Sequence, residues 1–368
     1  MDSQRKHHRH RKKTNPIKVV LILLGAVLFV AAVAAASAWY LWNHSAVLNQ
    51  EKMFVPQQRT DIGEPEPRPT ASPVPDAGAP AQYDFYDGGT YYRLRENVVS
   101  VLFMGIDSKK NEATDSTIVN GTNQGDTLLL GVFDTEHGTV QVLHVPRDTE
   151  ADVKVLDMAK QYVDTERTHI CLQHAYGDGG ALSCELQTEA VSNLLFGAPV
   201  NRYVSMGTNG VVKAVNAIGG VELTMQDDFS FYSKSMAQGK TVKLNGKRAL
   251  VYIQSRQNMR KDQTDQNRMK RQMQFLKAFI ATVKEKSKEN PALVLSVYDA
   301  VKAYVQTNLS LEELLFLANQ GLKVDLTDEN LRRLPGTVGT EAKPLFHMDE
   351  DAARRMAIEL FYEEIPAA

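Results

Sequence analysis

The chain has 368 residues, of which 43% are hydrophobic and 23% are charged, and its formal net charge is −2. These values exclude a collagen, a small disulfide-stabilised scaffold and a wholly disordered chain, while the length allows one large domain or two modest ones. Residues 1–18 carry seven Lys or Arg side chains against one Asp, so the other 350 residues have a net charge of about −8. An acidic body argues against nonspecific binding of nucleic acid as the function.

Residues 19–42 form a long apolar segment, with no charged side chain over 24 positions and three aromatic residues within positions 39–42. A helix of this length spans about 36 Å, which is enough to cross a hydrocarbon core of roughly 30 Å. The preceding basic residues, at 1–18, place the N-terminus in the cytoplasm. We therefore expect one membrane-spanning helix, with the rest of the chain outside the cytoplasm. The alternative is a cleavable signal peptide, because residues 36–38 have the small-x-small pattern of a cleavage site.

Residues 43–90 are predicted to form a stalk between the membrane and a folded domain at residues 91–368. Seven of the fourteen prolines fall between residues 56 and 80. Such a segment has little apolar mass to bury and favours the extended polyproline II conformation. At about 3.1 Å per residue, the Pro-rich part could hold the domain up to roughly 90 Å from the bilayer.

The folded domain alternates apolar runs of strand length with helical periods. Runs at residues 98–106, 127–133 and 139–145 predict buried strands. The sequence Ser310-Leu311-Glu312-Glu313 predicts a capping box at the start of a helix. Strands interleaved with helices indicate an α/β fold, in which a central mixed sheet is flanked by helices as an αβα domain with a helical C-terminal part. Helices are predicted at residues 185–196, 210–218, 247–255, 266–286, 292–305, 311–322 and 351–363.

Charged side chains stand at the ends of the predicted strands. The first strand is followed by Asp107, the second is preceded by Asp126, and the third is followed by Arg147 and Asp148. Each acid alone could cap a turn. Two aspartates on adjacent strands, however, can hold Mg²⁺ (or Mn²⁺) together with substrate phosphates, and Arg147 could form a bidentate bond to phosphate. The pattern therefore favours a metal and phosphate site at these strand ends.

A second polar cluster begins at Arg256 and continues into the longest predicted helix. On a helical wheel, Asp265 and Gln272 lie near the apolar stripe of this helix, and Arg268 lies on the same flank. A capped, solvated helix start would explain Asp265 alone. Residues 243–271 nevertheless carry nine Lys and Arg against two Asp in an otherwise acidic domain. A phosphate-bearing partner would account for that imbalance.

The chain contains, in this order, Met104-Gly105-Ile106-Asp107, Gly125-Asp126-Thr127, Val145-Pro146-Arg147-Asp148-Thr149, His174-Ala175-Tyr176-Gly177, Ala217-Ile218-Gly219-Gly220-Val221 and Asp265-x-x-Arg268-x-x-Arg271-Gln272. This series resembles the motifs of the LytR-CpsA-Psr family over residues 95–285, and the N-terminal anchor is similar too. The resemblance implies an αβα domain that binds a glycopolymer linked to polyprenyl pyrophosphate. It also implies transfer of the polymer to peptidoglycan, with a phosphodiester formed on the muramic acid 6-hydroxyl and polyprenyl phosphate released.

The same resemblance implies roles for particular residues. Asp107 and Asp126 would hold the metal, and an apolar tunnel between sheet and helices would take the polyprenyl tail. The residues implied for catalysis are Asp126, Arg147, Asp265 and Arg268. Those implied for pyrophosphate binding are Lys109, Arg147, Arg256, Arg268, Arg271 and Gln272.

Three positions depart from the family pattern. Gln124 stands where the family usually has Arg, Gln254 replaces the first Arg of an Arg-x-Arg pair, and Lys109 replaces an Arg after the first motif. Fewer guanidinium groups mean fewer bidentate phosphate donors. The sequence therefore favours an active phosphotransferase of a variant subgroup. It leaves open a noncatalytic lipid-pyrophosphate or glycopolymer binding module that regulates wall assembly, and a lipid pyrophosphatase.

Cys171 and Cys184 are the only cysteines. Outside the cytoplasm they could form a disulfide that stabilises the fold by about 3 kcal/mol, and two buried free thiols are the alternative. His169 and His174 lie nearby, but the spacing fits no usual zinc pattern. His144, inside a predicted strand, is expected to be a core histidine with satisfied hydrogen bonds.

Overall fold

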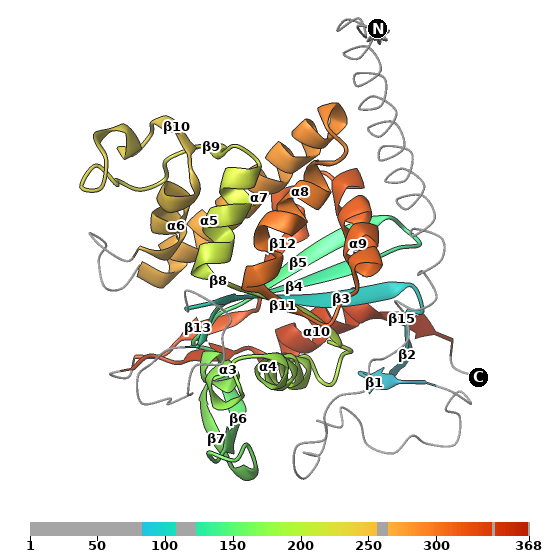
Figure 1. The fold of residues 1–368 in the computed structure, drawn as a ribbon. Coiled ribbons are helices and arrows are strands. Elements are labelled where there is room, and N and C mark those ends of the chain that lie inside the picture. The colour runs from blue at the N-terminus through green and yellow to red at the C-terminus, as the bar shows by residue number, and fades with distance from the viewer. Residues whose placement is uncertain (1–82, 108–122, 256–263, 341–342, 367–368) are drawn as a thin grey trace, which may run out of the picture.

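The computed structural model describes residues 83–107, 123–255, 264–340 and 343–366. The predicted membrane helix, most of the stalk, Lys109 and Arg256 lie outside these ranges. No helix within them combines the length and hydrophobicity that crossing a membrane requires. The described residues form three layers, with a central sheet between helices above and below it (Figure 1).

The central sheet is mixed, as predicted, and has the strand order β11-β8-β3-β4-β5-β12. Its middle strands β3, β4 and β5 are antiparallel to one another. β8 runs parallel to β3, β12 runs parallel to β5, and β11 pairs antiparallel with β8. The strand bounds are β3 Val98–Ile106, β4 Gly125–Asp134, β5 Thr139–Val145, β8 Arg202–Gly207, β11 Val305–Thr307 and β12 Leu331–Arg333.

The three middle strands form where the sequence predicts them, and two of them have the predicted bounds. Their apolar runs are nearly continuous because both faces of the sheet are buried. Leu102 and Leu130 pack into the cluster that includes α4 and α10, whereas Val101 and Phe133 pack into the cluster that includes α9. The alternation of strand side chains thus supplies a core to each outer layer.

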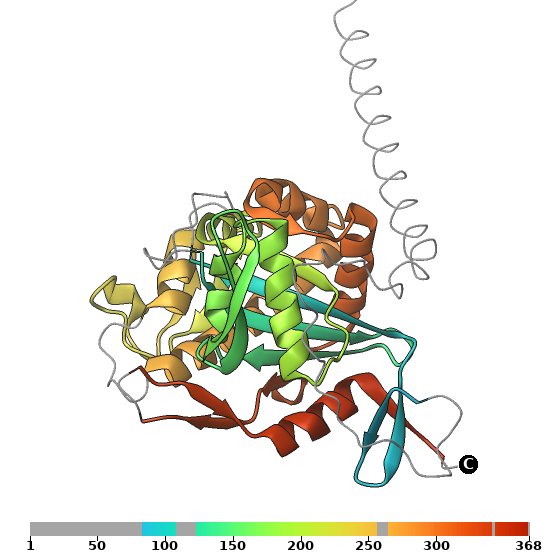
Figure 2. The same ribbon diagram turned by 90° about the horizontal axis from the view of Figure 1, so that it is seen from below.

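Helices α5–α9 lie above the sheet in Figure 1, and α3, α4 and α10 lie below it; Figure 2 shows α4 (green) and α10 (red) on the lower face. The seven predicted helices are all present, with end shifts of a few residues. The predicted capping box is confirmed, since the Ser310 hydroxyl accepts from the Glu313 backbone N at 3.2 Å and a Glu313 carboxylate oxygen accepts from the Ser310 backbone N at 2.7 Å. The helix bounds are α3 Gln173–Tyr176, α4 Ala181–Leu194, α5 Thr208–Ala217, α6 Gly246–Gln254, α7 Thr264–Glu289, α8 Leu293–Val301, α9 Leu311–Lys323 and α10 Glu350–Phe361, with 3-10 turns at Ile170–Leu172, Lys234–Met236, Lys302–Tyr304 and Asp328–Asn330.

Several small sheets surround the core, and apolar runs in the sequence predict none of them. They pair β6 with β7, β9 with β10, β13 with β14, and β15 with β2, which also pairs with β1. Most of their strands are short or exposed, so they lack the apolar periodicity on which strand prediction depends. The bounds are β1 Phe85–Asp87, β2 Thr90–Leu94, β6 Glu150–Leu156, β7 Tyr162–His169, β9 Val221–Thr224, β10 Thr241–Leu244, β13 Gly336–Val338, β14 Phe346–Met348 and β15 Tyr362–Ile365.

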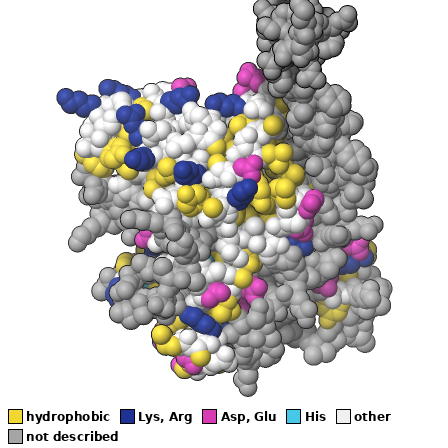
Figure 3. All heavy atoms as spheres, in the orientation of Figure 1, with side chains coloured by type: hydrophobic (Ala, Val, Ile, Leu, Met, Phe, Trp, Pro, Cys, Tyr) yellow, Lys and Arg dark blue, Asp and Glu magenta, His cyan; other side chains and the backbone are white. Residues whose placement is uncertain are grey.

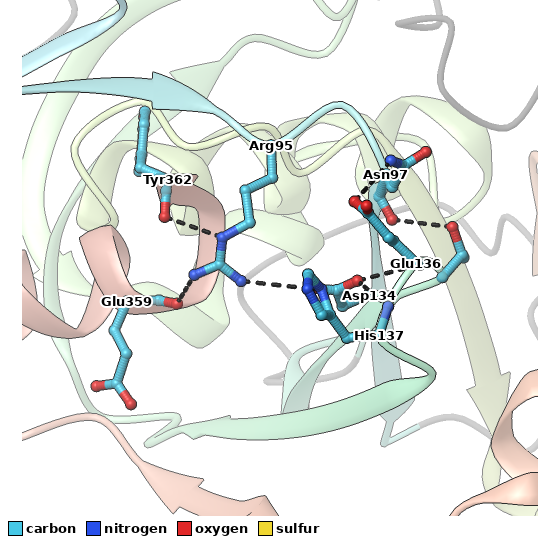
Figure 4. Close-up of polar contacts among 8 residues, drawn as sticks. Arg95, Asn97, Asp134, Glu136, His137, Glu359 and Tyr362 are labelled. Atoms are coloured by element: carbon cyan, nitrogen blue, oxygen red, sulfur yellow. Dashed lines mark hydrogen bonds and ion pairs between the residues drawn. The ribbon is translucent and has the colours of Figure 1, made fainter. Parts of the chain in front are cut away.

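Arg95 connects the end of α10 to the turn between β4 and β5 (Figure 4). Its guanidinium donates to the backbone oxygen of Glu359 at 2.6 Å and to that of Tyr362 at 2.9 Å, where the last carbonyls of a helix need donors. It also contacts Asp134 Oδ2 at 3.5 Å. Asp134 in turn accepts from the backbone N of Glu136 and of His137 at 3.1 and 2.9 Å. The network joins residues far apart in the sequence at the sheet end opposite Asp107.

We expect Asp134→Ala to lower the free energy of unfolding by about 1 kcal/mol in urea denaturation, because several donors lose their acceptor. Burial alone would raise the pKa of Asp134, but the hydrogen bonds from His137 outweigh it and lower the pKa. A depressed folded-state pKa gives stability that is present above about pH 3.9 and lost as the pH falls through the folded value. The difference between parent and variant should therefore shrink below about pH 4. A difference independent of pH would contradict the electrostatic part of this account.

Candidate functional site

A cavity of about 450 Å³ lies at the sheet end where β3 finishes and β4 begins. One part of its wall is polar and includes residues from β3, β4 and α7. Another part is apolar, with Met206 from β8, Val211 from α5, and Leu250 and Ile253 from α6. The full lining consists of Gly105, Ile106, Asp107, Gln124, Asp126, Thr127, Arg147, Met206, Thr208, Val211, Leu250, Ile253, Gln254, Arg268 and Gln272.

The two predicted metal ligands, Asp107 and Asp126, both line this cavity. Asp107 directly follows β3 and Asp126 lies in the neighbouring strand β4, with Ile106 paired to Gly125 across an irregularity in the register. Asp107 is exposed, and its carboxylate has no hydrogen bond or ion pair with any residue that the structure describes. Asp126 instead forms an ion pair with Arg147. The strand-end prediction thus brings both carboxylates to one site.

Arg147 is held by several acceptors just after β5. Its Nη1 donates to Asp126, its Nη2 donates to Gln124 Oε1 at 2.8 Å and Cys171 Sγ at 3.3 Å, and its Nε donates to Asp148 Oδ1 at 3.2 Å. Burial alone would lower the pKa of Arg147, but Cys171 and the two carboxylates raise it above its usual value. The side chain is therefore a fixed cation at the cavity wall.

The first turns of α7 present Arg268 and Gln272 to the cavity, as the helical wheel predicted. Arg268 is buried, with 8% of its surface exposed. The Gln272 amide donates to Thr127 Oγ1 at 3.1 Å and to the Ile253 backbone oxygen at 3.3 Å, which joins α7 to β4 and α6. Asp265 belongs to the same helix, but its side chain lies outside the described residues.

The prediction that Arg271 binds pyrophosphate is wrong. Its side chain is fully buried and does not line the cavity. The guanidinium forms an ion pair with Asp227 and donates to the backbone oxygens of Tyr252 and Ser255 at 2.7 and 2.6 Å. It also lies over the Phe229 ring, 5.3 Å from the centroid. Arg271 therefore stabilises the packing of α7 on α6 and the loop after β9.

The predicted disulfide between Cys171 and Cys184 is absent, and the alternative of two buried free thiols is the one found. The two sulfur atoms have different partners: Cys171 contacts Arg147, whereas Cys184 lies 3.8 Å from His174 Nε2. Burial raises the pKa of Cys171 to about 12, and it raises the pKa of Cys184 as well. Both are therefore neutral thiols near pH 7.

His144 departs from the prediction of a satisfied core histidine. It is 7% exposed, and its Nδ1 has no hydrogen-bond partner. Burial and the positive charges of Arg333 and Arg268 lower the pKa of His144 to about 3, so the imidazole is neutral. The sequence carries no local signal for Arg333, because β12 joins the sheet across a separation of nearly two hundred residues.

The sequence departures at Gln124 and Gln254 both lie in the cavity wall. Gln124 accepts a hydrogen bond from Arg147, which an arginine at this position could not do. Among the described lining residues, the charges are two carboxylates and two guanidinium groups. The basic side chains on the face shown in Figure 3 gather instead over α5–α8 and the β9–β10 hairpin, interspersed with hydrophobic ones.

Comparisons with known proteins show what the chain is similar to. The polyisoprenyl-teichoic acid–peptidoglycan teichoic acid transferase TagV of Bacillus subtilis is 27% identical over 253 residues, covering 65% of this chain and 59% of TagV. The corresponding transferase TagU of Enterococcus faecalis is 28% identical over 219 residues, covering 60% of this chain and 64% of TagU. This chain therefore spans less than two thirds of the length of these relatives.

The fold is also shared with solved structures. The crystal structure of B. subtilis TagV aligns with a TM-score of 0.55 at 25% identity, covering 72% of this chain and 98% of that chain. TagT bound to LI-WTA aligns with a TM-score of 0.53 at 22% identity, covering 77% and 94%, and this second similarity concerns the fold alone. The LytR_cpsA_psr family model matches residues 81–360, a range that contains every residue lining the cavity. The chain therefore belongs to the LytR-CpsA-Psr family.

Proposed function

We propose that this chain is a membrane-anchored, extracytoplasmic phosphotransferase that moves a glycopolymer from a polyprenyl-pyrophosphate carrier to peptidoglycan. The observation that carries the proposal is the composition of the cavity. It combines two carboxylates, two arginines and an apolar wall in one space, as a lipid pyrophosphate requires. The relatives that bear the name of teichoic acid transferases support the same reaction class.

In this proposal the lipid and the pyrophosphate occupy different parts of the cavity. Met206, Val211, Leu250 and Ile253 would contact the first isoprene units, because they form the apolar wall. Behind this wall lies the apolar cluster of α5–α8, to which Val211 and Ile253 also belong. Arg268 would donate to pyrophosphate oxygens, since charge-assisted bonds from a preformed wall bind phosphate strongly. The two N–H donors of the Gln272 amide are occupied by Thr127 and the Ile253 carbonyl, so Gln272 would fix the wall that α7, β4 and α6 form.

The donor set at the polar end fits a divalent cation. Asp107 has no partner among the described residues and faces the same cavity as Asp126, and carboxylate oxygens are the ligands that Mg²⁺ and Mn²⁺ prefer. Two arginines only balance two carboxylates, so a pyrophosphate would bring uncompensated negative charge into the site. Asp107 and Asp126 would hold Mg²⁺ or Mn²⁺, which would supply charge neutralisation and orientation of the phosphates.

Transfer then consists of one substitution at phosphorus. The hydroxyl oxygen of peptidoglycan forms a bond to the phosphorus that carries the polymer, its proton passes to water, and the bond from that phosphorus to the bridging oxygen breaks. Arg268 stabilises the charge that develops on the equatorial oxygens, because its buried guanidinium is fixed before the substrate arrives. Arg147 holds Asp126 in place through their ion pair. Polyprenyl phosphate leaves along the apolar wall.

Replacing Asp107 by Asn tests the metal role. We expect transfer of lipid-linked teichoic acid to peptidoglycan to slow by about 100-fold, because an amide is a poorer ligand than a carboxylate. Stability should change by less than about 0.5 kcal/mol, since the Asp107 side chain is exposed and contacts no described partner. Asp299→Asn on α8 makes the same chemical change outside the cavity and should leave the rate unchanged. Parental activity of Asp107→Asn would remove the metal from this proposal.

A further inference from the structure

The β9–β10 hairpin and the start of α6 expose a surface that has no part in the cavity. Figure 3 shows hydrophobic side chains over this hairpin, with Lys and Arg side chains around them. The hairpin lies in the layer above the sheet, on the same side as α5 and α6 (Figure 1). This hairpin surface comprises the exposed side chains of Phe231, Tyr232, Lys234, Lys240, Lys243 and Lys247.

Phe231 and Tyr232 are exposed on a loop that is otherwise held in place. They are 44% and 46% exposed. Phe229, beside them, is buried, and its ring centroid lies 5.6 Å from that of Phe231. The ion pair between Asp227 and Arg271 fixes the start of the loop to α7. The loop therefore presents two neighbouring aromatic side chains to solvent, and such side chains are typical of proteins that lie at a membrane interface.

The charge of the hairpin surface is positive. Residues 208–248 carry six Lys and Arg against three Asp and Glu, whereas residues 19–368 together have a net charge of about −8. One of the three acids, Asp227, is already paired with Arg271. Lys243 stands opposite Glu222 in the register of β9 and β10. The four lysines nevertheless form no ion pair with any residue that the structure describes, so their charge is available to an anionic partner.

The β6–β7 hairpin also exposes apolar side chains, but its charge is the opposite. Met158 and Val163 are 83% and 60% exposed. Residues 150–169 carry five Asp and Glu against three Lys and Arg. An anionic surface would repel this hairpin and attract the other one. Of these two exposed apolar regions, only the hairpin surface therefore suits an anionic partner.

The hairpin surface is continuous with the apolar wall of the cavity. The inward side chains of the hairpin, Leu223 and Leu244, belong to the same apolar cluster as Val211 and Ile253 of that wall. Lys247 stands on α6, which also carries Ile253. A soluble anion would use only the lysines, whereas a bilayer of anionic lipids also accepts aromatic side chains at the level of its headgroups. A bilayer is therefore the partner that satisfies both halves of this surface.

We propose that the hairpin surface binds the headgroup region of an anionic lipid bilayer. Phe231 and Tyr232 insert among the headgroups, and the lysines pair with lipid phosphates. The contact holds the α5–α6 side of the cavity near the membrane and so shortens the path of a lipid from the bilayer to the apolar wall. The inference goes beyond the proposed function, because the bilayer contact forms or fails to form whichever reaction the cavity performs.

The test follows a fluorescent label on the hairpin of the full chain, reconstituted into lipid nanodiscs. Cys171 and Cys184 are buried, so a cysteine introduced at an exposed position reacts selectively with an environment-sensitive dye. Ser235→Cys places the dye on the loop of the hairpin surface, whereas Met158→Cys places it on the β6–β7 hairpin below the sheet in Figure 1. The discs contain either phosphatidylcholine with an equal part of phosphatidylglycerol or phosphatidylcholine alone.

We expect the dye at residue 235 to emit at shorter wavelength in the anionic discs than in the neutral ones. The difference should disappear in about 1 M salt, where the Debye length is only about 3 Å. The dye at residue 158 should emit alike in both discs. The comparison of the two lipid mixtures uses one labelled protein, so it does not depend on the folding of any charge variant.

Two matched pairs of substitutions then test the lysines. Lys234→Gln with Lys240→Gln should lower the equilibrium between bound and released hairpin by about twentyfold, since each lysine near an anionic surface contributes about fivefold. Lys343→Gln with Arg355→Gln removes two exposed charges that lie outside the hairpin surface. This second pair should leave the emission at residue 235 unchanged.

Three results would overturn the bilayer contact. The first is equal emission at residue 235 in both kinds of disc, and the second is an equal loss in the two pairs, which would point to net charge. The third is a shift that depends on the ratio of protein to lipid, which would assign the surface to contact between copies of the chain. Transfer of lipid-linked teichoic acid is measured in the same discs. Transfer without the shift leaves the proposed function standing and the contact wrong, whereas the shift without transfer does the reverse.

Discussion

Replacing Arg268 by Ala is expected to lower the turnover of polymer transfer by at least about 100-fold. Arg268 lines the cavity on the first turns of α7 and is buried, so its charge acts on the substrate with little screening by water. Removing one fixed donor to a developing oxyanion typically costs two to three orders of magnitude in rate. Turnover is measured under saturating lipid-linked polymer, with the folded fraction determined from circular dichroism.

Arg268→Lys is the matched variant for this prediction. Lysine keeps the charge and most of the apolar stem but loses the planar fork that binds two phosphate oxygens. We expect a loss of about tenfold, between the parent and Arg268→Ala. A folded Arg268→Ala protein with parental turnover would show that the guanidinium does not contact the reacting phosphate.

Arg271→Ala is expected to cause the largest loss of stability, about 3 kcal/mol in the free energy of unfolding. The guanidinium is fully buried, and its removal leaves the Asp227 carboxylate and the carbonyls of Tyr252 and Ser255 without their donor. Breaking a buried ion pair by deleting one partner costs several kcal/mol. Urea denaturation of the purified protein measures the change.

The two arginines are expected to affect different measured quantities. Arg268 and Arg271 stand three residues apart on α7, yet the first should control rate and the second stability. The double variant Arg271→Met with Asp227→Leu removes both charges together and should recover part of the stability, because no unpaired charge remains buried. If Arg271→Ala instead remained as stable as the parent and lost only turnover, Arg271 would belong to the catalytic site after all.

Local sequence signals predicted the middle of the fold well. The strands at residues 98–106 and 139–145 have the predicted bounds, and the capping box at Ser310 is formed. These features depend on apolar runs and on hydrogen bonds within one helical turn, which neighbouring residues determine. β8 and β12 escaped prediction because three to six residues carry too little periodicity, and their places in the sheet depend on partners about a hundred residues away or more.

The site was predicted in part for the same reason. Strand ends predicted that Asp107, Asp126 and Arg147 lie near one another, and a helical wheel placed Arg268 on the inward side of its helix; all four line one cavity. The wheel gives the direction of a side chain from the helix axis, but it does not show what that side chain meets. The family resemblance assigned Arg271 to the substrate, but Asp227, from the loop after β9, is its partner.

The most direct test of the central claim is a transfer assay with the purified full chain, lipid-linked teichoic acid, peptidoglycan and Mg²⁺. Muramidase digestion and mass spectrometry of the product then identify the bond that has formed. We predict a phosphodiester between the polymer and the sugar hydroxyl of peptidoglycan, with one polyprenyl phosphate released per bond and no product after chelation of the metal. Tight binding of the lipid without any phosphodiester, or release of polyprenyl phosphate to water alone at the same rate, would contradict the assignment as a phosphotransferase.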